Sequence, residues 1–175
     1  MTANYKLDAI LEIRKFLWSK LVAAEIFDEN EYFSDSINDK IVPIIPVQQV
    51  SEIDQFLSGK KHIVYDKIGT SYEDNWMVCC EQILFTIYSP DVSEINEIRN
   101  FMIDEFRRVD ESARDVNRFA SLSNKFKFFS IFVADISPTE PSEEMQGLMS
   151  SDVILEIKYA RMVDSVGRFL LVAFG

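Results

Sequence analysis

The pattern of apolar and polar residues is most informative between positions 62 and 109, where an apolar segment, a turn and an amphipathic helix follow one another. Residues 62–68 and 76–88 are rich in apolar, β-favouring side chains, and the polar stretch 69–75 separates them. This arrangement predicts two antiparallel strands joined by a turn. Apolar residues occur at both parities of the second strand, which predicts a central strand covered on both faces. They are Trp76, Val78, Cys80 and Leu84 on one face, and Met77, Cys79, Ile83, Phe85 and Ile87 on the other.

A helix is predicted directly after this strand, over residues 92–109. The sequence Ser89-Pro90-Asp91 interrupts the strand, and Asp91 and Glu94 have the spacing of an N-cap and a third helical residue in a capping box. Apolar residues then recur every three or four positions, which is typical of one buried helical face. That face consists of Ile95, Ile98, Met102, Glu105, Phe106 and Val109, of which only Glu105 is polar.

The first part of the chain predicts one helix and one interrupted apolar segment. The spacing of apolar residues indicates a helix over residues 4–24, with Asn4 or Thr2 as its N-cap. Residues 41–50 are apolar but contain two prolines. Because proline cannot donate a hydrogen bond to a neighbouring strand, this segment is expected at a sheet edge or as an extended surface segment.

Three further strands are predicted in the last third of the chain. Residues 126–136 form an apolar run, and residues 152–161 alternate between apolar and polar, which indicates a half-buried strand. Residues 166–174 form a final apolar strand, whereas the polar residues 111–125 are expected to be irregular or weakly helical. The inward-facing residues of the alternating strand are Val153, Leu155, Ile157 and Tyr159.

These elements predict an α+β fold, with a single domain over residues 1–175. An N-terminal helix and a central amphipathic helix would pack on a mixed or antiparallel β-sheet. A chain of this length buries about 70% of its unfolded surface, enough for a core without disulfides or metals. Hydrophobic residues make up 47% of the sequence, so a wholly disordered chain is not expected.

The charge of the chain limits its partners. It carries 18 basic and 29 acidic residues, a formal net charge of −11. Proteins that grip DNA need Lys and Arg to displace phosphate counterions, so sequence-specific DNA binding is not expected. An acidic surface can still line a lumen through which DNA passes without being held. No window approaches the ~20 apolar residues of a membrane span, so a soluble protein without a membrane partner is expected.

The sequence offers no candidate catalytic, cofactor-binding or metal site. His62, the sole histidine, lies at a predicted strand start and is expected at the surface. Cys79 and Cys80 would point to opposite faces of a strand, a poor geometry for a disulfide or a shared metal, and are expected to be small buried residues. Phosphate-loop, dinucleotide and nucleophile-elbow motifs are absent from the sequence. We therefore expect a protein that is not an enzyme and uses no cofactor.

Three segments are candidates for contact with a partner. Residues 137–151 form a loop longer than a tight hairpin needs, which is either a contact loop or a solvated one. Residues 166–174 either complete the chain's own sheet or add to a neighbour's sheet. Residues 41–50 are compatible with an extended arm on another subunit. The candidate interface residues are Met145, Leu148, Met149, Ile44, Ile45, Phe169, Leu171 and Phe174.

The order of the predicted elements resembles the tail terminator, or tail-completion, proteins of long-tailed bacteriophages. The resemblance spans residues 4–161 and rests on element order and pattern. Its residues are the helical sequence LDAILEIRKFLWSKL, the strand and helix EQILFTIYSPDVSEINEI, and the strands FKFFSIFVADI and DVILEIKYAR. The segment 166–174 looks longer than a minimal member of the family needs, and could contact a sheath or connector component.

The resemblance implies a virion structural protein that is assembled in the host cytoplasm. In that family an amphipathic helix packs on a mixed sheet, and a ring of six copies caps the tail tube and joins it to the head–tail connector. The implied partners are other copies of the chain, the tail tube protein and a neck protein, with DNA only passing through the lumen. Two alternatives stay open, namely another phage neck or head-completion component, and a small acidic host adaptor or immunity-type binding protein.

Overall fold

A computed structural model of the chain describes residues 8–35, 38–51, 57, 59–73, 78–120 and 126–161. These residues form an α+β fold in which helices pack on a mixed, mostly antiparallel sheet, as the sequence predicts. The helices are α1 (Ala9–Ala23), α3 (Val92–Phe106) and α4 (Val109–Phe119), with short 3-10 turns η1 (Glu29–Tyr32) and η2 (Val47–Gln49).

The main sheet has the strand order β3-β4-β5-β8-β6, and a short strand β7 pairs with the start of β8. Only the β3–β4 pairing is parallel. A separate two-stranded sheet joins β1 and β2. The strands are β1 (Phe33–Ser34), β2 (Asp39–Lys40), β3 (Ile44–Pro46), β4 (His62–Tyr72), β5 (Val78–Ser89), β6 (Phe126–Ile136), β7 (Glu140–Pro141) and β8 (Met149–Arg161).

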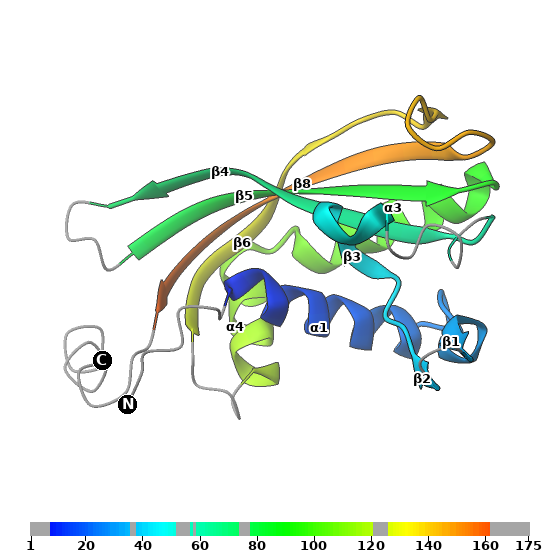
Figure 1. The fold of residues 1–175 in the computed structure, drawn as a ribbon. Coiled ribbons are helices and arrows are strands. Elements are labelled where there is room, and N and C mark those ends of the chain that lie inside the picture. The colour runs from blue at the N-terminus through cyan, green and yellow to red at the C-terminus, as the bar shows by residue number, and fades with distance from the viewer. Residues whose placement is uncertain are drawn as a thin grey trace.

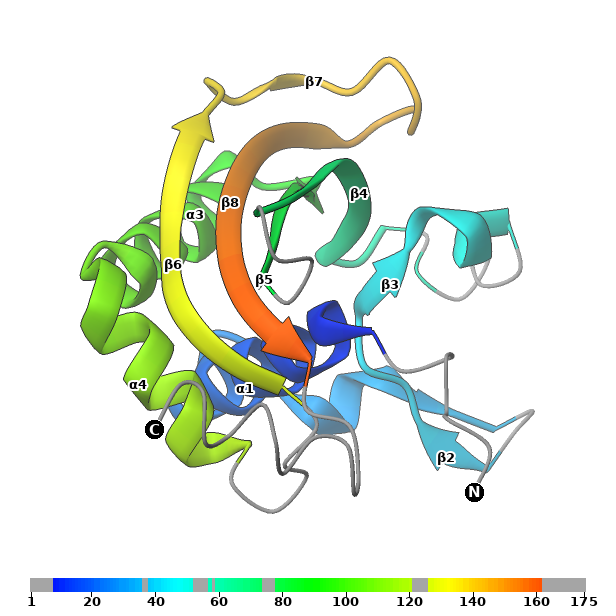
Figure 2. The same ribbon diagram turned by 90° about the vertical axis from the view of Figure 1, so that its left-hand side faces the viewer.

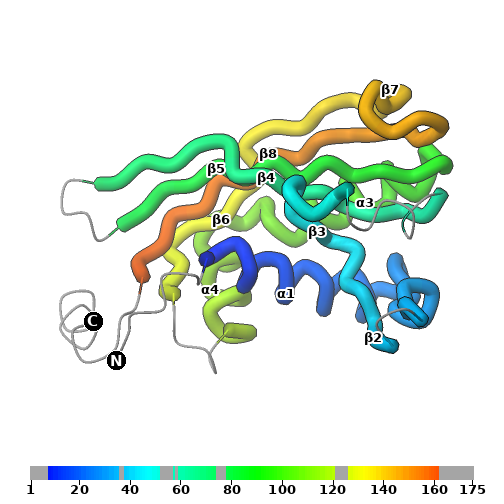
Figure 3. Tube along the Cα trace, in the orientation of Figure 1, coloured from blue at the N-terminus to red at the C-terminus, as the bar shows by residue number. Residues whose placement is uncertain are grey.

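The helices α1, α3 and α4 all lie on one side of the main sheet (Figure 1). The long strands β6 and β8 curve strongly, as the view along them makes plain (Figure 2). At one end of the sheet, β4 and β5 project beyond α1 and α4 (Figure 3). One face of the sheet is therefore covered by helices, and one end of the β4–β5 hairpin lies outside that cover.

The core forms between the helices and the odd-numbered face of β5 and β8. Residues Ile83, Phe85 and Ile87 of β5 are fully buried. The predicted inward-facing residues of β8, Val153, Leu155, Ile157 and Tyr159, are buried as well. α3 presents Ile95, Ile98, Met102 and Phe106 to this face, and all four are fully buried.

Cover on the two faces of β5 is unequal, which corrects the expectation of a strand buried on both sides. β5 is central, because it pairs with β4 and β8. On its even-numbered face, Val78 and Tyr88 at the two ends are buried, but Cys80 and Leu84 between them are only half-buried, and Gln82 is exposed. Trp76 and Met77 lie outside the described residues. The apolar residues of this face therefore line a side of the sheet that no helix of the described chain covers.

The helix boundaries differ from the predicted ones at two places. α1 begins at Ala9, and Asp8 caps it by accepting a hydrogen bond from the Ile10 N–H at 3.4 Å, so the predicted caps Asn4 and Thr2 are wrong. The predicted helix 92–109 ends at Phe106, and a new helix, α4, begins at Val109. Val109 is 41% exposed rather than part of the buried face.

Residues 111–119, for which the sequence predicted irregular or weakly helical structure, belong to the helix α4. Ser112 anchors the turn between the two helices, because its hydroxyl donates to the Glu105 carbonyl at 3.0 Å. Ala113 and Val116 are buried, whereas most of α4 is charged and exposed. A small apolar stripe is thus enough to hold this polar helix against β6.

Phe106→Asp is expected to unfold the domain. The Phe106 side chain is fully buried and its ring lies 6.0 Å from that of Phe16 in α1, so the substitution removes core packing and buries an unpaired charge. We expect a loss of at least about 4 kcal/mol in the free energy of unfolding, measured by chemical denaturation.

Val109→Asp is the matched control, since Val109 is exposed in the first turn of α4. An aspartate there is favoured by the helix dipole, so its effect should stay within about 0.5 kcal/mol. A folded Phe106→Asp protein with near-normal stability would contradict the assigned packing of α3.

Candidate functional site

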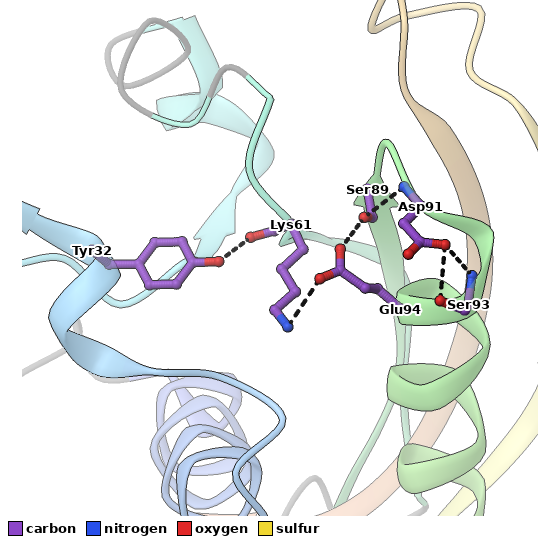
Figure 4. Close-up of polar contacts among 6 residues, drawn as sticks. All are labelled: Tyr32, Lys61, Ser89, Asp91, Ser93 and Glu94. Carbon is purple, nitrogen blue, oxygen red and sulfur yellow. Dashed lines mark hydrogen bonds and ion pairs between the residues drawn. The ribbon is translucent and has the colours of Figure 1, made fainter.

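A polar junction joins the start of α3 to three other parts of the chain (Figure 4). Asp91 caps α3 by accepting hydrogen bonds from the backbone N–H and the hydroxyl of Ser93, both at 2.8 Å. Glu94 does not reach back to the Asp91 N–H as a capping box would require. Instead, Ser89 lies between them, accepting from the Asp91 N–H at 3.0 Å and donating to Glu94.

The same junction holds β4 and η1 in place. Lys61, just before β4, forms an ion pair with Glu94 at 3.3 Å. The Tyr32 hydroxyl of η1 donates to the Lys61 carbonyl at 2.6 Å. Burial is the main cause that raises the pKa of Tyr32, so this hydroxyl stays protonated. Each of these groups has a partner within the chain. The junction therefore has a structural role, in which it holds η1, β4, β5 and α3 together.

His62 is buried, which corrects the prediction of a surface histidine. It does begin β4, but its side chain is only 1% exposed and its ring stacks on Tyr88 of β5 at 5.2 Å between centroids. Its Nδ1 lies 2.8 Å from the Lys60 carbonyl and donates to it. The strand position was predictable from the sequence, whereas the ring stacking depends on the register between β4 and β5.

The predicted contact loop 137–151 folds back on its own chain. Residues 140–141 form β7, and β8 already begins at Met149. Leu148 is buried, and Met145 and Met149 are partly buried against the core. Because these three side chains pack inward, they contribute less exposed surface than the sequence suggested.

The other candidate interface residues divide into two groups. Ile44 and Ile45 are 0% and 2% exposed and belong to the core through the edge strand β3, so the prediction of an arm on another subunit is wrong for them. The prediction that residues 41–50 lie at a sheet edge is confirmed for β3. Phe169, Leu171 and Phe174 lie outside the described residues.

A shallow hollow of about 370 Å³ lies on the uncovered face of the sheet, between the sheet and the segment that connects β6 to β8. The Tyr88 hydroxyl donates to Glu144 at 3.0 Å, and Thr86 donates to Asp152 at 2.8 Å. Burial, followed by the hydrogen bond to Glu144, raises the pKa of Tyr88. The hollow presents carboxylates and hydroxyls, a lining that suits a polar or cationic partner surface. It is lined by Leu84, Thr86, Tyr88, Ser137, Pro138, Glu140, Pro141, Ser142, Glu143, Glu144, Ser150 and Asp152.

A second polar cluster lies on the helix-covered face of the sheet, and its central residue is Glu81 of β5. The side chain is only 4% exposed, and its Oε1 accepts from the Tyr159 hydroxyl at 2.9 Å and pairs with Lys67 at 3.0 Å. Lys67 also pairs with Asp8 at 2.9 Å. Burial alone would lower the pKa of Lys67, but its hydrogen bonds to the two carboxylates outweigh that effect and raise it.

Sequence analysis did not single out this cluster. The available signal was that Glu81 is the only charged residue in the apolar run 76–88. Its Oε2 is buried and accepts no hydrogen bond from the described residues. Cys79 lies in the same cluster, where burial raises the pKa of its thiol. A protonated thiol is a poor nucleophile, and the cluster does not have the arrangement of an activated cysteine.

No group of three or more His, Cys, Asp or Glu side chains in the described part of the chain is placed to hold a metal ion. Among the helices of the same residues, none has the length and apolar character needed to cross a membrane. No protein-family model matches the sequence, and no curated protein matches it either.

Lys67→Met is expected to destabilise the protein by about 3 kcal/mol, because it leaves the buried Glu81 without a charged partner. The double variant Lys67→Met/Glu81→Leu should recover most of that loss in chemical denaturation. Lys158→Met is the matched control, since Lys158 is similarly exposed but pairs with the exposed Glu73, and it should cost far less stability than Lys67→Met. Equal losses for both lysine variants would contradict a buried role for Glu81.

The protein is expected to lose stability above about pH 10. Burial is the first cause that raises the pKa of Tyr32, Tyr65, Tyr88 and Tyr159 above the usual value of 10.0. A raised pKa in the folded state means that the unfolded chain binds fewer protons above pH 10, so stability is full below that pH and falls as the pH rises. Tyrosinate absorbance should therefore rise together with the loss of far-UV circular dichroism. Complete tyrosine ionisation in a protein with native dichroism would refute the assignment.

Proposed function

We propose that this chain is a ring-forming structural protein of the neck of a long-tailed phage, and specifically a tail terminator. In this role it caps the tail tube and joins it to the head–tail connector. It acts as a virion component assembled in the host cytoplasm, and it performs no catalysis.

The observation that carries the proposal is the asymmetry of the sheet. Helices cover one face, and the β4–β5 end projects beyond them (Figures 1 and 3). The chain therefore presents two unlike surfaces, a projecting pair of strands and a half-exposed sheet face. A closed ring requires such a heterologous contact, in which one surface of a subunit meets a different surface of the next.

The order of the helices and strands supports the choice of the tail terminator family. The resemblance rests on an N-terminal helix, a hairpin, an amphipathic helix and two further strands. The observed order α1, β4, β5, α3, β6 and β8 has these elements in that sequence. α4 is an addition between the amphipathic helix and β6, and it leaves the remaining order unchanged.

The charge of the chain supports a ring through which DNA passes. The net charge is −11, and the hollow on the uncovered sheet face is lined by Glu140, Glu143, Glu144 and Asp152. Acidic walls repel the phosphate backbone, so a lumen with such walls lets DNA slide without holding it.

Electron microscopy of the purified protein, alone and with the tail tube protein of the same phage, tests this function. We expect closed rings about as wide as the tube, and tubes that carry a cap and stop growing when the protein is added. Sedimentation velocity should give the mass of a hexamer for the rings.

Two outcomes would contradict the proposal in different ways. A protein that stays monomeric or dimeric and leaves tube ends unchanged belongs to the adaptor class. Rings that bind the connector but ignore the tube belong to another neck component.

A further inference from the structure

Among the described residues, the outer side of β4 is an open sheet edge along part of the strand. β3 pairs only with Ile63, Val64 and Tyr65. From Asp66 to Ser71, no strand of the described chain pairs with this side of β4. The Glu73 N–H donates inward to Val78, so the alternation of a strand directs the N–H of Thr70 outward. This backbone is available for strand addition.

The opposite edge of the sheet is blocked at Phe128 of β6. The Asn117 side chain in α4 accepts from the Phe128 N–H and donates to its carbonyl, each at 2.8 Å. The amide group thus occupies the two backbone groups that an added strand would use. No comparable side chain of the described residues occupies the open edge of β4. The strand has one lysine, Lys67, which pairs with Glu81, so its charge does not hinder strand addition at the edge.

A groove of about 290 Å³ lies beside the open edge, where β3 leaves β4. Its walls combine apolar side chains, such as Ile10 and Pro46, with Asp8 and Lys67. Lys67 carries one positive charge between two carboxylates, those of Asp8 and Glu81, so this part of the site has a net charge of −1. The Glu81 Oε2 is buried and accepts no hydrogen bond from the described residues. The site therefore suits an apolar strand that carries a cation.

We propose that the open β4 edge and this groove receive residues 166–174 of a second copy of the chain. This inference rests on the proposed function, since it identifies one contact of the ring. The segment VGRFLLVAF is apolar, carries Arg168 as its one charge, and contains no acidic residue. Nine extended residues cover about 30 Å, which is more than the open edge requires. Its charge is opposite to that of the Asp8–Lys67–Glu81 cluster.

The position of β5 and β4 between β8 and the open edge favours a neighbouring copy over the chain's own edge. β8 ends at Arg161, and five residue steps to Val166 span at most about 18 Å. The outer side of β4 lies three strand spacings from β8, about 14 Å along a straight line. β5 and β4 occupy that line, because Val78 pairs with Ala160 and bonds to Glu73. A connection to the chain's own edge would have to pass around or across these two strands, whereas the edge of a neighbouring subunit requires no such path.

Mixing two variants tests the proposal. Deletion of residues 166–174 removes the donor segment and keeps the edge, whereas Thr70→Pro removes the outward N–H and keeps the segment. Each variant alone should be monomeric in sedimentation velocity, and an equimolar mixture should form a heterodimer that grows no further. A mixture that stays monomeric, or a Thr70→Pro protein that assembles like the unaltered chain, would overturn the proposal. Thr70→Ala keeps the N–H and should assemble normally.

A second pair of variants guards against a folding defect in Thr70→Pro. Ile68 on β4 and Ile136 on β6 are both 47% exposed. Ile68→Lys should weaken self-association about tenfold or more by charging the proposed contact, whereas Ile136→Lys should leave it unchanged. Equal effects of the two lysines would count against the β4 edge.

The two proposals fail in distinguishable ways. If the unaltered chain forms tube-capping rings but the variant mixture stays monomeric, the strand contact is wrong and the proposed function stands. If the mixture forms heterodimers but the unaltered chain gives open filaments or ignores the tube, the contact stands and the tail-terminator function falls.

Discussion

The packing of α3 against the odd-numbered face of β5 and β8 is the interaction on which the rest of the structure depends. Ile95, Ile98 and Met102 fill one side of this contact, and the buried residues of the two central strands fill the other. Burial of a large aliphatic or aromatic side chain contributes about 1.5–3 kcal/mol, so this layer outweighs any single polar contact. α1 then closes the layer through the contact of Phe16 with Phe106.

Because the helices cover only one face of the sheet, the other face is left partly exposed to solvent. The even-numbered side of the sheet carries Leu84, Thr86 and Asp152, which are half-buried and are not covered by any helix of the described residues. An antiparallel sheet tolerates such a face in water, because its backbone is satisfied within the sheet. The surfaces proposed above for contact with a partner are therefore those that the core does not use, namely this face and the outer edge of β4.

The sequence predicted the strands better than the helix ends, for a physical reason. Alternation in β8 and continuous apolar runs in β5 and β6 reflect burial that local periodicity reports directly. The break after Phe106 was missed because Val109 continues the apolar spacing of α3, although it begins a new helix. Periodicity also could not assign Ile44 and Ile45 to the core, since their burial depends on parallel pairing with β4. The Glu81 cluster joins β4, β5 and β8 with the cap of α1, and only the register of these elements brings its members together.

The strand order has a consequence for how the chain comes into being. β4 and β5 are neighbours in sequence, so their hairpin can form as soon as both have been synthesised. β5 then waits for β8, whose Leu155 pairs with Ile83 across more than 70 intervening residues. Such long-range pairing is slow, because the chain must lose the entropy of closing a long loop before the stabilising contacts between the strands form. During that interval the central strand of the finished sheet is itself an edge, with its most apolar residues exposed. The strand order therefore predicts an aggregation-prone stage during synthesis, which ends only when β8 is added to the sheet.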